Sequence, residues 1–150
     1  MAYTQILYHI IIRTKYSDKA LELEKAPELY RYIWGIIKNK GCVLYRINGM
    51  EDHIHMLCDL HPTVPLADLI KAIKGSSGKW IKASGLFPKF RGWGIKYCAL
   101  TYAYKQKEVI TNYIKNQQKH HRNESFQQEI QRLWKEQNIQ KDIKWFWEET

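Results

Sequence analysis

Two histidines flank one isoleucine in the run His53-Ile54-His55, near the middle of the chain. The surrounding segment 53–60 is short and apolar-rich, with turn-forming residues on either side, which predicts a β-strand. Because side chains alternate along a strand, both histidines point to one face. The opposite face is apolar and holds Ile54, Met56, Cys58 and Leu60. Imidazoles are metal ligands, but two are too few for a complete site, and the alternative is that both rings simply pack.

A second group of potentially reactive residues lies on a predicted helix over residues 107–121. Four of its residues fall at i, i+3, i+4 and i+7 and share one face: Ile110, Tyr113, Ile114 and Gln117. A tyrosine hydroxyl can form a covalent intermediate, and an amide oxygen is a ligand that suits Mg²⁺ or Mn²⁺. The alternative is a packed tyrosine ring with a wet hydroxyl, beside a partly exposed glutamine. Periodicity does not single out Tyr113 among the ten tyrosines.

The charge of the chain indicates a polyanionic partner. The formal net charge is +9 and the pI is about 9.4, so nucleic acid is the first candidate, against a basic surface that binds nothing specific. With a metal and a tyrosine nucleophile, the chemistry would be strand transfer through a covalent phosphotyrosine. Such a linkage retains the energy of the cut bond, and the absence of a P-loop from the sequence agrees with a reaction that needs no ATP.

Length and composition limit the number of domains and the class of protein. A chain of 150 residues suits a single domain, 1–150, with a real core. No apolar run is long enough to cross a bilayer, and the N-terminus lacks the features of a secretory signal. Cys42, Cys58 and Cys98 form neither a zinc pattern nor a disulfide framework. These features predict a protein of the reducing cytoplasm with no membrane partner.

The order of predicted elements indicates the fold. The segments read as strand, helix, strand, strand, helix and strand, over residues 3–13, 27–40, 42–48, 53–60, 64–82 and 95–104. This is the order of an α+β, ferredoxin-like antiparallel sheet with both helices on one face. The other face, with the two histidines, would be free to carry a site. A capping box at Ser125 and Gln128 predicts a further helix, and Trp145 and Trp147 in the tail are expected to pack on the body.

Four stretches carry a resemblance to a known family: YHIIIRTKY, DHIHML, GWGIKYCALTY, and YIKNQQKHH followed by SFQQE. In this order and spacing the chain resembles the single-tyrosine HUH transposases, small enzymes of insertion sequences that move as single-stranded DNA. It also resembles their domesticated relatives, which act on repeated extragenic palindromes. The resemblance runs through nearly the whole chain. The chain departs from the family where Ser17-Asp18 follow RTKY and where Tyr104-Lys105 precede the tyrosine helix.

The resemblance implies a DNA transposase of bacteria or archaea. His53 and His55 would bind Mg²⁺ or Mn²⁺, and Gln117 would complete the site. Tyr113 would attack the scissile phosphate, which gives a 5′-phosphotyrosine and a free 3′-OH. The family works as a homodimer on single-stranded DNA with hairpin ends. Charge and placement add five candidate DNA contacts, each of which is otherwise a solvated basic residue: Arg13, Lys15, Lys71, Lys74 and Lys79.

Three other functions remain open at this point. A ferredoxin-like sheet with aromatics is also the plan of RNA-binding RRM domains, although their RNP1 pattern is absent from this sequence. A domesticated relative that processes palindromes would share the same residues. A structural protein would use the histidines and the tyrosine only for packing.

Overall fold

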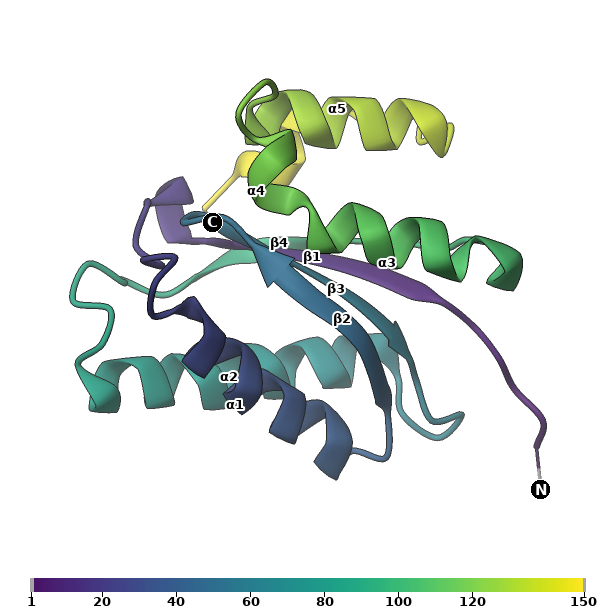
Figure 1. Ribbon diagram of the computed structural model, residues 1–150, viewed down its shortest axis with the longest axis horizontal. Helices are drawn as coiled ribbons and strands as arrows, with labels where there is room; N and C mark the ends of the chain where they lie inside the picture. The colour runs from purple at the N-terminus through teal and green to yellow at the C-terminus, as the bar shows by residue number, and fades with distance from the viewer. Residues whose placement is uncertain (1, 150) are drawn as a thin grey trace.

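The fold is built on one antiparallel sheet of four strands in the order β2-β3-β1-β4, seen in a computed structural model that describes residues 2–149 (Figure 1). The strands are β1 (Tyr8–Thr14), β2 (Val43–Gly49), β3 (His53–Asp59) and β4 (Trp93–Leu100). With helices after β1 and β3, this order confirms the predicted α+β, ferredoxin-like fold.

Two helices, α1 (Ala26–Asn39) and α2 (Leu66–Ser84), cover one face of the sheet (Figure 1). The main apolar core lies between them and the strands. From β3 it contains Ile54, Met56 and Cys58, which confirms the predicted apolar face. Opposite these residues are Leu29, Ile33, Leu69 and Ile73 of the two helices. No helix within residues 2–149 is both long and apolar enough to span a membrane.

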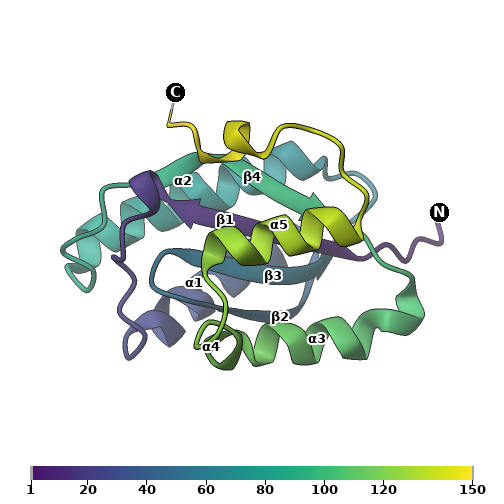
Figure 2. The same ribbon diagram turned by 90° about the horizontal axis from the view of Figure 1, so that it is seen from above.

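The second face of the sheet is covered too, contrary to the prediction of a free face. Three helices and a short 3-10 turn lie over it: α3 (Lys107–Lys115), α4 (Gln117–His120), α5 (Phe126–Glu136) and η3 (Ile143–Trp147) (Figures 1 and 2). Two small apolar clusters attach them, and they contain Ile11 and Cys98 with Ile130, and Leu57 with Ile114. The sheet is therefore the middle layer of three.

The predicted helix over 107–121 is interrupted at Asn116, between α3 and α4. The Asn48 side chain donates from Nδ2 to the carbonyl of Lys115 at 2.9 Å. The N–H of Lys119, which would bond that carbonyl in a continuous helix, instead bonds the carbonyl of Asn116. A side chain of β2 thus helps to end α3, and the break changes the direction in which Gln117 projects.

Two predicted strands differ in length from those observed. β1 begins at Tyr8 rather than at residue 3, because its partner β3 ends at Asp59 and the pairing starts at Tyr8 with Cys58. β4 begins at Trp93 and ends at Leu100, where the prediction was 95–104. The capping box of α5 is confirmed, since Gln128 N–H bonds Ser125 Oγ at 3.1 Å.

Arg13 is buried on the second face and bound by the C-terminal residues. Its Nη2 donates to the carbonyl of Glu148 at 2.9 Å, its Nε to that of Phe146 at 3.2 Å, and its Nη1 pairs with the Glu149 carboxylate at 2.6 Å. A Cβ on Gly94 would lie 2.9 Å from Nη1, so only glycine fits beneath the guanidinium. The predicted role of Arg13 as a DNA contact is incompatible with this position, because its donors already bind the protein.

Replacing Arg13 by methionine should destabilise the fold by about 2–4 kcal/mol, because a partly buried carboxylate and three carbonyls would lose a donor. Urea unfolding measures this directly. Arg46→Met, on the exposed side of β2, is the matched control and should change stability by less than about 0.5 kcal/mol. Equal, small effects of both substitutions would show that the C-terminal segment does not depend on Arg13.

Candidate active site

Three fully buried side chains form a group that could hold a divalent cation: His53 and His55 from β3 and Glu129 from α5. Oε1 of Glu129 lies 3.3 Å from Nε2 of His53 and 3.0 Å from Nε2 of His55. Neighbouring ligands of an octahedral ion with bonds of ~2.1 Å are about 3.0 Å apart. The two imidazoles and the carboxylate therefore fit a divalent cation.

Each histidine is held from behind by a polar partner. Nδ1 of His53 lies 2.6 Å from Oδ1 of Asp52, and Nδ1 of His55 lies 2.7 Å from Nε2 of His9. A carboxylate only accepts, so Nδ1 of His53 carries a proton and Nε2 is the atom presented to the cation position. Burial lowers the pKa of His53, but Asp52 and Glu129 outweigh it and raise this pKa above the ordinary value. A proton on Nε2 would compete with a cation for this side of His53.

The Glu129 carboxylate joins the parts of this site. Nε2 of His121 lies 3.0 Å from Oε1, and Nε2 of Gln117 donates to Oε2 at 2.8 Å. The hydroxyl of Tyr113 also donates to Oε2. Burial acts to raise the pKa of Glu129, but His55, His121 and His53 together hold it well below its ordinary value. Glu129 is therefore an anion, which is the form in which a carboxylate binds Mg²⁺ or Mn²⁺.

Gln117 lies inside the site, beside the carboxylate of Glu129 rather than in the predicted position of third ligand. It is fully buried, and its Oε1 is 3.4 Å from Nε2 of His53. Glu129, in contrast, faces both His53 and His55 and carries the negative charge. The carboxylate is the better third ligand on this geometry, and Gln117 supports it through its amide N–H.

Tyr113 lies at the rim of the same site, with its hydroxyl between an acceptor and a donor. The acceptor is Glu129, and the donor is Nη2 of Arg132, at 2.7 Å. The ring of His120 stacks on the tyrosine at a centroid distance of 4.6 Å. Burial and the Glu129 charge raise the pKa of Tyr113, while Arg132 opposes them, so the side chain is a neutral phenol at pH 7. Tyr113 thus lies beside the candidate ligand group of its own chain.

Sequence reasoning missed five members of the site: His9, Asp52, His121, Glu129 and Arg132. For Glu129 a signal was present. The predicted apolar stripe of α5 contains Phe126, Ile130 and Leu133, and Glu129 falls on that stripe at i+3 from Phe126. A carboxylate at a buried position needs a partner, which marks it as a candidate ligand. His9 has no comparable signal, because only the pairing of β1 with β3 brings it to His55.

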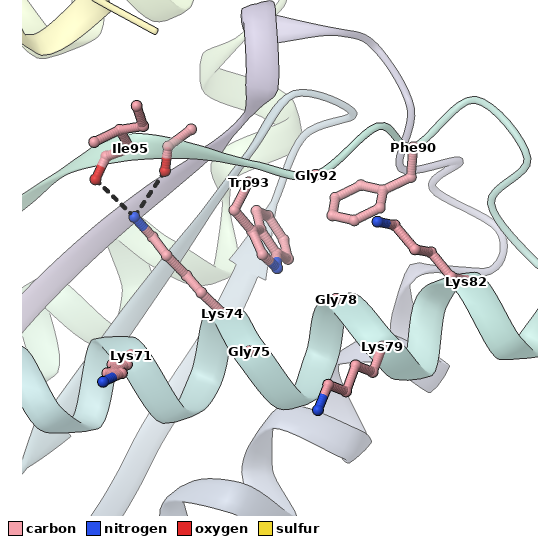
Figure 3. A pocket seen from close by; sticks show the side chains of 11 residues that line it. Lys71, Lys74, Gly75, Gly78, Lys79, Lys82, Phe90, Gly92, Trp93 and Ile95 are labelled. Carbon is pink, nitrogen blue, oxygen red and sulfur yellow. Dashed lines mark hydrogen bonds between the residues drawn. The ribbon is translucent and has the colours of Figure 1, made fainter. Parts of the chain in front are cut away.

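Four of the five predicted DNA contacts gather on the other side of the sheet, around a groove between α2 and β4. Figure 3 shows α2 lysines along this groove, with Phe90 and Trp93 on its opposite wall. Its basic lining residues are Lys71, Lys74, Lys79 and Lys82. Lys15 adjoins one end, where its backbone N–H bonds the carbonyl of Gly92 at 2.8 Å.

The lysines of the groove are not equivalent. Lys71, Lys79 and Lys82 are exposed, and none of them forms a salt bridge within residues 2–149. Lys74 is half-buried and donates to the carbonyls of Gly94 and Ile95 at 2.7 and 3.0 Å (Figure 3). Burial and the Arg13 charge lower its pKa to about 8. Lys74 therefore ties α2 to β4, while the exposed lysines are available to an anion.

A divalent cation should stabilise the protein through the buried ligand group. We expect Mn²⁺ at one hundred times its Kd to add about 2.7 kcal/mol to the free energy of unfolding, and chelation to reverse this. His53→Ala should abolish the gain, as measured by thermal unfolding and calorimetric titration. His61→Ala, in the exposed loop after β3, is the control and should keep the gain. Equal stabilisation of wild type and His53→Ala by Mn²⁺ would place the cation elsewhere.

The two candidates for the third ligand can be separated by substitution. Glu129→Gln keeps the shape and removes the charge, and we expect it to weaken Mn²⁺ binding by at least about 100-fold. Gln117→Ala should weaken binding less, because it removes only a supporting amide. Calorimetric titration of both variants decides between them. A larger loss in Gln117→Ala would return the ligand role to the amide.

Comparison with known proteins identifies the family of the chain. The family model described as "Transposase IS200 like" matches residues 2–117. The ISDra2 transposase TnpA of Deinococcus radiodurans is 30% identical over 118 residues, which cover 75% of this chain and 84% of that protein.

Two solved structures share the fold. A crystal structure of a protein described as a transposase from Deinococcus radiodurans R1 has a TM-score of 0.60 and 31% identity, over 78% of this chain and 95% of that one. A REP-associated tyrosine transposase bound to a REP hairpin has a TM-score of 0.58 at 14% identity, over 81% of this chain and 74% of that one. The second likeness concerns the fold alone. On the extent of the family match and the identity to TnpA, the chain belongs to the IS200-like transposase family.

Proposed function

We propose that this transposase cleaves and rejoins single-stranded DNA through a covalent bond to Tyr113, with a divalent cation at His53, His55 and Glu129. The observation that carries the proposal is the shared carboxylate. One oxygen of Glu129 faces the two histidines, and the other accepts from the Tyr113 hydroxyl. This contact supports Tyr113 as the nucleophile beside a ligand group that suits Mg²⁺ or Mn²⁺.

Each residue has a distinct part in the reaction. When bound, the cation would polarise the scissile phosphate and stabilise the leaving 3′ oxygen. His9 and Asp52 orient the two ligand imidazoles, and Gln117 orients Glu129. The Tyr113 oxygen attacks phosphorus, the bond from phosphorus to the 3′ oxygen breaks, and the phenolic proton ends on the freed 3′-OH. A later 3′-OH reverses these steps on the 5′-phosphotyrosine and rejoins a strand.

The lysine groove is the proposed path of the DNA backbone. Exposed ammonium groups on α2 suit phosphates, and the partly exposed Trp93 offers aromatic surface for unstacked bases. In this proposal Lys15, Lys71 and Lys79 contact phosphate, and Lys74 mainly holds the wall of the groove.

The proposed substrate is single-stranded DNA that carries a hairpin, and the proposed assembly is a homodimer. The hairpin is supported by the related REP-associated transposase, which was solved with a REP hairpin. The dimer is supported by the family resemblance. In the chain described here Tyr113 meets the ligand group of the same chain, so the proposed dimer needs no exchange of the tyrosine helix between subunits.

Tyr113→Phe should abolish a covalent protein–DNA adduct, because the attacking oxygen is gone. Labelled single strands from the DNA that flanks the coding sequence would be incubated with the protein and Mn²⁺. A band that survives denaturation reports the adduct, and chelator should remove it. Tyr104→Phe, at an exposed tyrosine close in sequence, is the control and should form the adduct normally.

The outcomes of this experiment separate the possible errors. An adduct that persists in Tyr113→Phe would overturn the choice of nucleophile. Tight hairpin binding without any adduct in the wild type would favour a non-catalytic nucleic-acid-binding module.

Lys71→Gln and Lys79→Gln should each weaken DNA binding and reduce the slope of log affinity against log salt by about 0.7 for a single strand, because each removes one phosphate contact. Fluorescence anisotropy over a salt series measures both quantities. Lys135→Gln, an exposed position on α5 across the sheet from the groove, is the control. If this control lowers the slope as much as the groove variants do, the DNA does not follow the groove.

A further inference from the structure

The guanidinium of Arg132 is bonded to the oxygen that the proposed function assigns as nucleophile. Its Nη2 donates to the Tyr113 hydroxyl at 2.7 Å, and its Cζ lies 5.3 Å from the centre of the tyrosine ring. The same hydroxyl donates to Glu129 on its other side. The tyrosine oxygen therefore has a carboxylate in the direction of its proton and a fixed positive charge beside its lone pairs.

Arg132 is held in this place by two other acidic side chains. Its Nε and Nη2 donate to the two carboxylate oxygens of Glu124, at 2.9 and 3.0 Å, and its Nη1 lies 3.3 Å from Glu136. Glu124 directly precedes Ser125, whose capping box fixes the start of α5. The guanidinium is thus oriented before any substrate arrives. This is a condition for electrostatic stabilisation without reorganisation.

The position of Arg132 also faces the approach to the site. His53, His55, Gln117 and Glu129 are fully buried, whereas the Arg132 side chain is 36% exposed. Arg132 thus lies on a solvent-accessible side of the tyrosine oxygen, where a phosphate can approach. Guanidinium groups match phosphate oxygens in geometry and retain their charge at any working pH.

We propose that Arg132 is a catalytic residue that binds a non-bridging oxygen of the scissile phosphate while it contacts the Tyr113 oxygen. This inference rests on the proposed function, since it needs Tyr113 as the nucleophile. As the bond from the tyrosine oxygen to phosphorus forms and the bond to the 3′ oxygen breaks, negative charge gathers on the phosphoryl oxygens beside the guanidinium. The phenolic proton leaves along the bond to Glu129 and ends on the 3′-OH, so atoms and charge balance.

Arg132 lies outside the part of the chain that the family model matches, which ends at residue 117. It comes from α5, as does Glu129, while Tyr113 comes from α3. Other basic side chains on this face of the sheet make different contacts. Arg13 binds the C-terminal residues, and His120 stacks on the ring of Tyr113.

The test compares single-turnover cleavage and rejoining rates for wild type, Arg132→Gln and Arg132→Lys on a labelled flanking single strand with Mn²⁺. We expect Arg132→Gln to slow both directions by about 100-fold, the usual effect of removing one preorganised donor. DNA affinity and Mn²⁺ binding should change little, which separates a catalytic role from a structural one. Arg132→Lys should fall between, because an ammonium keeps the charge but cannot bond Glu124 and the tyrosine oxygen with the same geometry.

Controls keep the result interpretable. Arg122→Gln, at an exposed arginine before α5, should cleave at the wild-type rate. Added guanidinium ion should partly restore Arg132→Ala but not Tyr113→Phe. If circular dichroism shows that Arg132→Gln does not fold, the test rests on Arg132→Lys. Cleavage by Arg132→Lys at the wild-type rate would then overturn the proposal.

The failures of the two proposals are distinguishable. A wild-type adduct, its loss in Tyr113→Phe and a normal rate in Arg132→Gln would overturn the role of Arg132 and leave the proposed function standing. No adduct in the wild type would overturn both.

Discussion

The candidate active site depends on the contacts of one buried side chain, the carboxylate of Glu129. Three imidazoles, an amide and a phenol surround it, and they come from β3, α3, α4 and the loop before α5. Taking an ion out of water costs several kcal/mol unless its partners are well placed. The same contacts that satisfy Glu129 therefore fix the distance between the candidate nucleophile and the ligand histidines. A shift of α5 would disturb every one of these contacts at once.

The two faces of the sheet carry different kinds of side chain. Toward α1 and α2 the side chains are apolar and close-packed, and this layer stabilises the fold. Toward α3, α4 and α5 the central strands present His9, Arg13, His53 and His55 among small apolar clusters. Arg13 binds the C-terminal residues as Glu129 binds the histidines, so two buried charges of opposite sign attach the C-terminal part of the chain to the sheet. Burial of polar groups is tolerated here because each has a partner.

The site is closed at its centre and open at its edge. The ligand side chains are fully buried, while Tyr113 and Arg132 lie at the rim, and the lysine groove is on the opposite side of the sheet beside β4. The candidate active site and the lysine groove thus lie in different layers of the fold. Family membership rests on residues 2–117, yet α5 supplies both the carboxylate and the guanidinium that contact Tyr113.

The sequence by itself determined the order of strands and helices in the ferredoxin-like unit, the sharing of one strand face by His53 and His55, and the α5 capping box. Strand alternation, helix periodicity and capping act over a few residues, so they can be read locally. The break at Asn116, the burial of Arg13 and the meeting of His9, Glu129 and Arg132 with the predicted residues were decided only by the tertiary structure. Each depends on a contact across many residues, such as Asn48 with Lys115 or Arg13 with Glu149. A hydrogen bond or ion pair between distant segments leaves no periodic trace in the sequence, so its partners become known only when the sheet and the helices over it are in place.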